Sequence, residues 1–305
     1  MIKVLGHKSP DTDSTGSPII WAWYLTEVAG TPARAVLLGE PNTEAAFVLK
    51  HWNLTKPEII ADVDASDSVV IVDTNNPAEL PPSINDAKIL AIIDHHMLVG
   101  GIKTKTPIDI TMRPLACTAT IMHDLIGADL ARAPREIKGA MLSCILYDTL
   151  EFRSPTTTPH DRAVAEKLAA DLGISIPEFA AALFAAKSDV SSFSDAELLR
   201  MDSKEYNVAG KELRVSVLET TSPSVVLNRK ASLMASMPAV ATEDGAEQVL
   251  LFVIDILNEE ATLLVPNDLV KQMAEASFGC KVTGDTVVLP GIMSRKKQII
   301  PMLKL

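Results

Sequence analysis

The chain has 305 residues, enough for two domains or one large one, and its 47% apolar and 22% charged residues are typical of a globular rather than a disordered protein. The net charge of −11 disfavours binding to nucleic acid or to an anionic membrane unless basic side chains cluster locally. An anionic substrate would therefore have to meet metal ions or a local basic patch.

The amino terminus begins directly with a predicted strand, residues 2–6, and lacks the basic start, long apolar stretch and cleavage site of a signal peptide. No apolar run is long enough to cross a bilayer. The cysteines, Cys117, Cys144 and Cys280, are odd in number and widely spaced, which fits neither a disulfide framework nor a zinc site. These features predict a cytoplasmic protein with reduced cysteines.

Strand and helix signals alternate through the first part of the chain. The polar residues 13–15 precede an apolar stretch at 19–28, which is a helix N-cap signal followed by a helix. Further strands are predicted at 33–38, 69–73 and 89–94, and helices at 134–147, 160–172 and 176–186. This pattern favours an α/β fold with a mainly parallel sheet covered by helices on both faces.

A small, polar segment at 187–195 is typical of a linker. We therefore predict a first domain over residues 1–187, a linker over 188–194 and a second domain over 195–305. Within the last range, strands are predicted at 213–218, 249–254 and 261–265, and a helix at 267–277 capped by Asn267. This pattern indicates a smaller α/β domain with a mixed sheet.

Acidic and imidazole side chains follow three of the predicted strands. In an open parallel sheet, ligands bind outside the carboxyl ends of the strands, so these side chains should meet in one crevice. Crowded, unpaired carboxylates repel one another, and a divalent cation relieves that repulsion. The candidate ligands, including one residue that follows a predicted apolar helix, are His7, Asp11, Asp13, Asp73, His95 and Asp148.

These ligands divide naturally between two metal ions. His7 and Asp11 could hold one ion while Asp13 turns to a second, with Asp73 bridging the two and His95 and Asp148 completing the second site. Carboxylate with imidazole suits manganese, iron, cobalt or zinc, and oxygen ligands alone suit magnesium. Two ions about 3.5–4 Å apart, with a hydroxide held between them, would drive an in-line displacement at phosphorus.

Each of these residues also has a plainer interpretation when it is taken alone. Asp11 could simply cap the helix that follows it, and an aspartate at a strand end is usually a turn residue. The ordered combination of Gly-His-x-x-Pro-Asp-x-Asp, a strand-end Asp73 and Ile-Asp-His-His favours a metal centre over coincidence.

The densest positive patch of the chain is the run 294–298, Ser-Arg-Lys-Lys-Gln, near the carboxyl terminus. Apolar residues flank this run, so we expect it to belong to a folded element rather than to a tail. Arg295 offers a planar fork for phosphate and Lys296 a compact charge. The chain contains neither a Gly-rich phosphate loop ending in Gly-Lys-Ser/Thr nor a Gly-x-Ser-x-Gly elbow.

Together, His7–Asp13, Asp73, Asp94-His95-His96 and the run 294–298 resemble the family II inorganic pyrophosphatases of the DHH phosphoesterase superfamily, over essentially the whole chain. The resemblance implies a two-domain enzyme, active between its domains, that hydrolyses pyrophosphate to two phosphates. It implies Mn²⁺ as the preferred metal, with Co²⁺ or Mg²⁺ possible, at two or more ions per site, and a homodimer formed through the amino-terminal domain. The residues it assigns are the metal ligands His7, Asp11, Asp13, Asp73 (bridging), His95 and Asp148, and the pyrophosphate contacts His96, Lys204, Arg295 and Lys296.

Two departures from the family pattern concern neighbouring residues and remove no predicted ligand. The family often has Asp-His-Asn-Glu where this chain has Asp73-Thr74-Asn75-Asn76, and Phe-Lys-Ser-Pro-Thr where this chain has Arg153 in place of the lysine. Two alternatives stay open. The first is another DHH phosphoesterase acting on polyphosphate, short oligonucleotides or adenosine bisphosphate, although the nucleotide-directed Gly-Gly-Gly-His motif is missing. The second is a non-catalytic metal- or phosphate-binding regulator.

Overall fold

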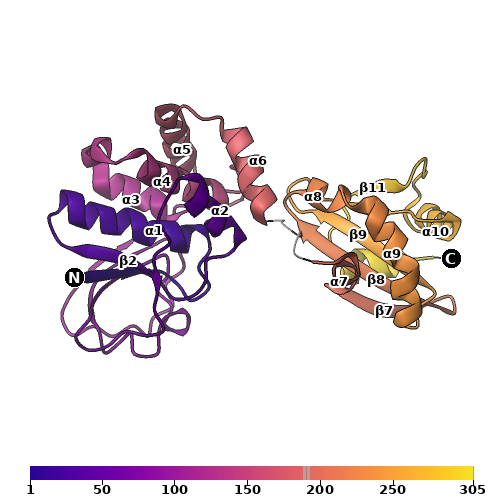
Figure 1. The fold of residues 1–305 in the computed structure, drawn as a ribbon, viewed down its shortest axis with the longest axis horizontal. Helices are drawn as coiled ribbons and strands as arrows, with labels where there is room; N and C mark the ends of the chain where they lie inside the picture. Colours follow the sequence, from indigo (N-terminus) through magenta and orange to yellow (C-terminus); the bar gives the residue numbers. More distant parts are fainter. Residues whose placement is uncertain (188–189, 191–192, 305) are drawn as a thin grey trace. The chain divides into compact units, whose positions relative to one another are not determined.

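The computed structural model describes residues 1–187, 190 and 193–304, apart from the side chains of Lys187 and Lys296. The chain divides into two units, Met1–Ala186 and Lys187–Leu305, each with its own sheet and core (Figure 1). Of the linker predicted at 188–194, residues 188, 189, 191 and 192 lie outside the described part.

The first unit is built on a six-stranded sheet in which all neighbouring strands are parallel, in the order β3-β2-β1-β4-β5-β6. The predicted parallel sheet is therefore confirmed, and four strands begin and end within one residue of their predicted bounds. The two outer strands, β3 and β6, are short and were not predicted. The strands are β1 (Ile2–Leu5), β2 (Ala33–Leu37), β3 (Glu58–Ile59), β4 (Ser68–Val72), β5 (Lys88–Asp94) and β6 (Asp109–Met112).

Six α-helices connect or follow these strands. They are α1 (Thr12–Trp23), α2 (Thr43–His51), α3 (Thr118–Ile126), α4 (Arg135–Asp148), α5 (Pro159–Leu172) and α6 (Ile176–Lys187), with short helical turns η1 (Tyr24–Val28), η2 (Pro77–Glu79) and η3 (Gly127–Arg132). Helix α1 begins earlier than the predicted cap at 13–15, because the Asp11 carboxylate accepts the Ser14 amide at 2.9 Å.

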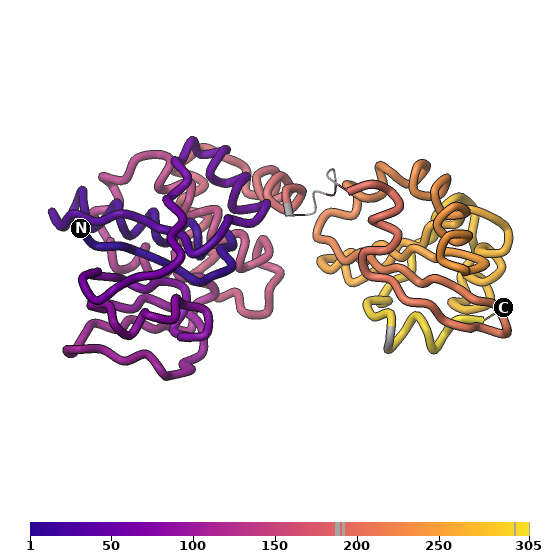
Figure 2. The backbone as a smooth tube through the Cα atoms, turned by 60° about the horizontal axis from the view of Figure 1, so that its bottom comes forward, coloured from indigo at the N-terminus to yellow at the C-terminus, as the bar shows by residue number. Residues whose placement is uncertain are grey.

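The two faces of this sheet are covered differently. Because side chains alternate along a strand, Val4 and Val70 face one side and Leu5 and Ile71 the other. The first side packs against the α-helices, which line one side of the unit in Figure 1. The second side is closed by loop residues such as Val63, Leu80 and Ile84, so loops supply most of the cover that we expected from helices there. The chain between β5 and β6 forms a long loop away from the helices (Figure 2).

The second unit has a five-stranded mixed sheet in the order β11-β10-β9-β8-β7, in which only the β8–β9 pair is parallel. The mixed sheet that we predicted is confirmed, and helices cover both of its faces. The strands are β7 (Ser203–Val208), β8 (Lys211–Thr220), β9 (Gln248–Asp255), β10 (Glu260–Leu264) and β11 (Thr286–Pro290). The helical elements are α7 (Asp195–Arg200), α8 (Pro223–Leu227), α9 (Lys230–Glu243), α10 (Asp268–Phe278), η4 (Arg295–Ile299) and α11 (Ile300–Met302).

Local capping signals explain where several helices begin. Asn267 caps α10 by accepting the Val270 amide at 3.0 Å, as we predicted.

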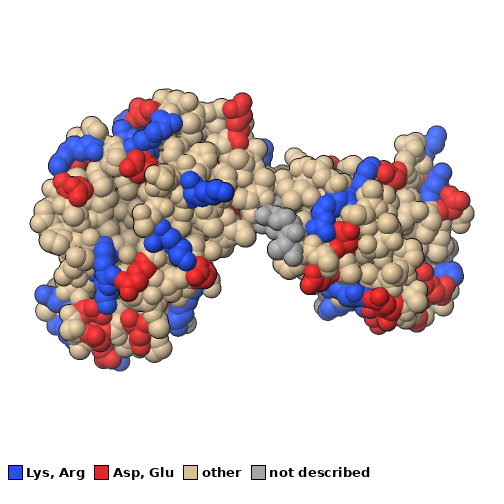
Figure 3. All heavy atoms as spheres, viewed as in Figure 1, with Lys and Arg blue, Asp and Glu red and all other residues tan. Residues whose placement is uncertain are grey.

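Within the described residues, no single helix is long and apolar enough to span a membrane; α5 and α6 reach that length only together, across a bend of 101°. On the face of each unit seen in Figure 3, basic and acidic side chains are interspersed.

Candidate metal centre

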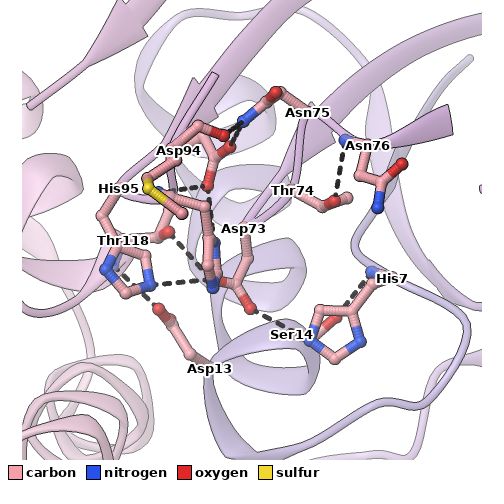
Figure 4. Close-up of polar contacts among 12 residues, drawn as sticks. His7, Asp13, Ser14, Asp73, Thr74, Asn75, Asn76, Asp94, His95 and Thr118 are labelled. Carbon is pink, nitrogen blue, oxygen red and sulfur yellow. Dashed lines mark hydrogen bonds and ion pairs between the residues drawn. The ribbon is translucent and has the colours of Figure 1, made fainter. Parts of the chain in front are cut away.

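The carboxyl ends of three adjacent strands bring the predicted ligands together. In the order β1-β4-β5, His7 follows the first strand, Asp73 the second and His95 the third. Figure 4 shows these side chains turned toward one another, with Asp73 in the middle. This is the convergence expected at the carboxyl edge of a parallel sheet.

The first group of possible ligand atoms is His7, Asp11 and Asp73, which lie within 4.8 Å of one another. His7 Nε2 is 3.5 Å from Asp73 Oδ2 and 3.7 Å from Asp11 Oδ1. The Asp11 Oδ1 that lies nearest to His7 also accepts the Ser14 amide at the start of α1, so the same atom belongs to the helix cap and to this group. An imidazole with two carboxylates is a ligand set suited to manganese or a similar ion.

The other Asp73 oxygen faces the second predicted group. His95 Nε2 is 3.4 Å from Asp73 Oδ1, and His96 Nδ1 is 3.9 Å from the same atom. One carboxylate therefore has an imidazole at each of its two oxygens, which is the arrangement that a bridging ligand requires. By distance alone His96 also belongs with Asp73 and His95, although we assigned it to the substrate.

Asp13 and Asp148 come together where helices α1 and α4 pack closely. A Cβ atom on Gly16 would lie 2.4 Å from Cys144 Sγ, so only glycine permits this spacing. Ligand atoms of Asp13, Asp148 and Cys117 lie within 4.8 Å of one another. The wide spacing of the cysteines predicts an ordinary core residue at Cys117. It is buried, but its Sγ also lies 3.3 Å from Asp13 Oδ2 as a donor, and no local signal indicated this contact.

Surrounding groups hold the candidate ligands in fixed orientations. His95 Nδ1 lies 3.2 Å from the Leu115 carbonyl oxygen, and donation of its proton there would leave Nε2 free for a metal. Asp13 accepts the Ser17 hydroxyl at 2.5 Å and the Thr118 amide at 2.8 Å. The Thr118 hydroxyl donates to Asp73 at 3.1 Å. Leu115, Ser17 and Thr118, which were not predicted to belong to the site, therefore orient the predicted ligands.

The backbone at Asp73 is also specialised. Its φ of 60° lies in the left-handed region, which aspartate and asparagine tolerate better than most residues. Its amide donates to the Ile93 carbonyl at 2.9 Å, which ties the end of β4 to β5. This turn directs the carboxylate of Asp73, a residue that is 1% exposed, into the group of ligands.

The gathered carboxylates shift one another's protonation. Burial, together with the charges of Asp13, Asp148 and Asp11, raises the pKa of Asp73 well above its usual range. Burial and the neighbouring carboxylates likewise raise the pKa of Asp148. Burial would also raise the pKa of Asp13, but the attraction of His95 and hydrogen bonds such as that from Ser17 lower it overall.

We expect the metal-free protein to lose stability as the pH rises above the ordinary pKa of aspartate. The raised pKa values of Asp73 and Asp148 mean that the folded protein binds more protons than the unfolded chain between the ordinary and the raised pKa. The contribution of these two protonated carboxyls to the free energy of unfolding is complete below their pKa in the unfolded chain. It is lost as the pH rises through their pKa in the folded protein. The lowered pKa of Asp13 changes the stability only at lower pH, below the ordinary pKa of aspartate.

Thermal unfolding in a chelator, measured from about pH 5 to about pH 8, tests this expectation. The melting temperature should fall across the range in chelator, and saturating manganese should remove the decline. A melting temperature that rises with pH in chelator would contradict the assignment of the raised pKa values.

A cation fits this site on structural grounds. Asp148 Oδ2 is buried and has no hydrogen-bond partner among the described residues. An unpaired buried carboxylate oxygen is costly, and it faces other acidic groups rather than a basic side chain. The residues present therefore match a divalent ion in both charge and donor type.

The predicted phosphate contacts of the second unit lie on two of its elements. Lys204 is exposed on β7, and Arg295 begins η4. The Arg295 guanidinium donates to Asp202, to the backbone carbonyl at 2.6 Å and to Oδ1 at 2.8 Å, and so lies beside the start of the Lys204 strand. The side chain of Lys296 lies outside the described part of the chain.

The departures from the family pattern have clear local partners. The Thr74 hydroxyl donates to Glu79 at 2.7 Å, and Asn76 caps η2 by accepting the Ala78 amide at 3.0 Å. Arg153 forms an ion pair with Glu151 at 3.1 Å. None of these contacts involves a candidate metal ligand.

Comparisons with known proteins match the whole chain. Residues 1–147 match the family described as "DHH family, N-terminal domain", and residues 181–305 match "DHHA2 domain". The chain is 39% identical over 310 residues to a "Probable manganese-dependent inorganic pyrophosphatase" of Deinococcus radiodurans, covering 100% of this chain and 98% of that protein. It is 33% identical to a protein of the same description in Lactobacillus helveticus, covering 98% and 96%.

Two solved structures are also similar. The crystal structure of a "Methanococcus jannaschii putative family II inorganic pyrophosphatase" is 33% identical, with a TM-score of 0.62 and coverage of 99% of this chain and 98% of that one. An "exopolyphosphatase-related protein" from Bacteroides fragilis has a TM-score of 0.51 at 13% identity, with coverage of 98% and 89%, and shares the fold.

Proposed function

The chain belongs to the manganese-dependent, family II inorganic pyrophosphatases, and from this premise we propose that it hydrolyses pyrophosphate to two phosphates at the centre around Asp73. The observation that carries the proposal is the position of Asp73, whose two oxygens lie 3.5 Å from His7 Nε2 and 3.4 Å from His95 Nε2. One carboxylate between two imidazoles suits two divalent ions, and the relatives' printed names mention manganese.

The proposed division of labour follows the chemistry of each side chain. His7 and Asp11 would hold one ion, Asp13, His95 and Asp148 the other, and Asp73 both. Bound divalent ions would supply an acidified water and neutralise charge on the phosphoryl oxygens. The protein itself fixes the ligands through hydrogen bonds such as that between His95 Nδ1 and Leu115.

His96 has the character of a substrate contact rather than a ligand. It is half exposed, and its Nδ1 is 2.9 Å from the buried Asp94 carboxylate. Through that hydrogen bond, Asp94 raises the pKa of His96, which favours the positively charged form. A partly exposed imidazolium next to the ligands would attract a phosphate oxygen.

The positive side chains of the second unit would complete the binding of the anion. We expect Arg295→Ala to lower kcat/KM for pyrophosphate by about ten- to hundredfold, because a charge-assisted hydrogen bond contributes about 1.5–3 kcal/mol. Manganese affinity should be unchanged, since no candidate ligand belongs to this unit. The control is Arg200→Ala, which also removes an arginine paired with an aspartate, Asp244. Equal losses in both variants would argue against a substrate role for Arg295.

A phosphate-release assay tests the proposed activity. The purified protein should hydrolyse pyrophosphate faster than tripolyphosphate or a dinucleotide, most strongly with Mn²⁺ and less with Mg²⁺. A preference for tripolyphosphate would favour an exopolyphosphatase, and a preference for the dinucleotide would favour a nucleotide-directed relative. Manganese binding without turnover of any of the three would indicate a regulator.

We also propose that the protein forms a homodimer through its first unit. Strand β6 is the last strand of the sheet, and its free edge could pair with a second copy. Large apolar side chains on β6 and on the preceding loop are solvent-exposed, from 57% for Ile110 to 89% for Met97, and include Leu98 and Val99. Leu98 and Ile110 line one hollow together, and exposed apolar side chains beside a sheet edge are typical of an interface.

Sedimentation velocity tests the dimer. We expect the wild-type protein to sediment as a dimer and Leu98→Asp as a monomer, because the charge would be buried at the interface. The matched control is Val288→Asp, which alters an exposed apolar residue of the second unit. A monomeric wild type would contradict the proposal.

A further inference from the structure

Asn75 is a buried side chain next to the metal centre whose polar atoms all have partners. Asn75 is 3% exposed. Its Nδ2 donates to Asp94 Oδ2 at 2.6 Å and to the Met97 carbonyl at 3.0 Å, while its Oδ1 accepts the Val99 amide at 2.8 Å. Figure 4 shows this amide beside Asp94. The side chain thus links the segment after β4 to the segment after β5.

The amide group suits this position in a way that a carboxylate would not. Two of the partners of Asn75 are oxygens that need a donor, and the third is an N–H that needs an acceptor. Rotation of the amide by half a turn would set like groups against one another, so the orientation is fixed. Asn75→Asp would bring two carboxylates into direct contact at the Asp94 side.

The chain of contacts continues from Asp94 to His96. Asp94 is fully buried, and while its Oδ2 accepts Asn75, its Oδ1 accepts the His96 amide at 3.0 Å and contacts His96 Nδ1 at 2.9 Å. Asn75 and His96 therefore hold the two oxygens of one carboxylate. If Asn75 were removed, Asp94 could rotate and the backbone of residues 97–99 would lose two of its anchors.

We propose that Asn75 is a positioning residue, which orients His96 toward the substrate through Asp94. This inference rests on the proposed function, in which His96 contacts pyrophosphate. Asn75 itself touches none of the candidate metal ligands among its described hydrogen bonds, so its effect should appear on substrate and turnover rather than on metal affinity.

A double-mutant cycle with a matched control tests the proposal. Asn75→Ala should lower kcat/KM for pyrophosphate by about ten- to hundredfold, the usual cost of losing a residue that orients a functional side chain. In a His96→Ala background the same change should cost less than about twofold, because residues acting through one another are not additive. Manganese binding, measured by calorimetry, should be unaffected. The control is Asn85→Ala. The Asn85 side-chain oxygen accepts the backbone N–H of Lys103, in the loop between β5 and β6. The described hydrogen bonds of Asn85 reach no candidate metal ligand.

The role of Asn75 and the proposed activity are tested by different measurements. Wild-type phosphate release tests the proposed function, and only the comparison of variants tests Asn75. Three results would each overturn the positioning role. The loss of kcat/KM caused by Asn75→Ala could be as large in the His96→Ala background as in the wild type. Alternatively, Asn75→Ala could keep wild-type activity, or Asn85→Ala could lose as much activity as Asn75→Ala. Should Asn75→Ala fail to fold, Asn75→Ser replaces it in the cycle, because it keeps a polar side chain without setting a second carboxylate against Asp94.

Discussion

Asp73→Asn is expected to abolish manganese-dependent hydrolysis of pyrophosphate. The substitution keeps the shape of the side chain and suits the left-handed backbone, φ 60°, that this position requires. It removes the charge that lies between His7 and His95. Charge stabilisation by metals is worth several kcal/mol, so kcat/KM should fall by at least about a thousandfold. Asp73→Ala should have the same effect on activity.

The same variant should be no less stable than the wild type when metal is absent. Burial and three neighbouring carboxylates raise the pKa of Asp73, so its ionised form is disfavoured in the metal-free fold near neutral pH. A neutral amide removes that cost, and the apo variant should unfold at an equal or higher temperature. Phosphate release and calorimetric unfolding measure the two halves of this prediction.

The control is Asp109→Asn, which changes an exposed aspartate at the start of β6 in the same sheet. It should leave activity and manganese binding unchanged. If Asp73→Asn retained wild-type turnover with manganese, Asp73 would not be a bridging ligand. A large loss of apo stability would instead indicate that the carboxylate has a structural role.

Removal of metal is expected to produce the second large effect, a loss of both activity and thermal stability. A ligand that binds only the folded state at about 100 times its Kd stabilises it by about 2.7 kcal/mol. For a unit of this size, such a loss lowers the melting temperature by about 5–11 °C. The unpaired Asp148 Oδ2 and the crowded carboxylates explain why the stabilisation is lost with the ion.

Dialysis against a chelator followed by titration with manganese, cobalt or magnesium measures both effects. Activity and melting temperature should recover together, and at the lowest concentration with manganese. Asp73→Asn should show little dependence of its melting temperature on metal. A wild-type melting temperature that is insensitive to chelator would contradict a metal centre built on these residues.

Much of the fold follows from signals that act within a few residues. Continuous apolar runs bounded by polar residues predicted β1, β2, β4 and β5 nearly to the residue, and the asparagine before α10 marked its start. The alternation of strands and helices was sufficient to predict a parallel sheet. Because the carboxyl ends of parallel strands share one edge, it also indicated that His7, Asp73 and His95 would meet.

The sequence could not reveal which side chains complete that edge. The contacts of Asp13 with Cys117 and of Asn75 with Asp94 join residues 104 and 19 positions apart, and neither pair has a local pattern. The same holds for Arg295 and Asp202, 93 positions apart, and for the loops that cover the second face of the first sheet.

The sequence by itself therefore determined four strands of the first sheet, their parallel character and the candidate ligands, since periodicity, capping and strand-end position are properties of short segments. The tertiary structure alone decided the close packing of α1 on α4 at Gly16, the orientation of each ligand and the link from Asn75 to His96. Those features depend on distances between segments remote in the chain, which are set only when the core packs.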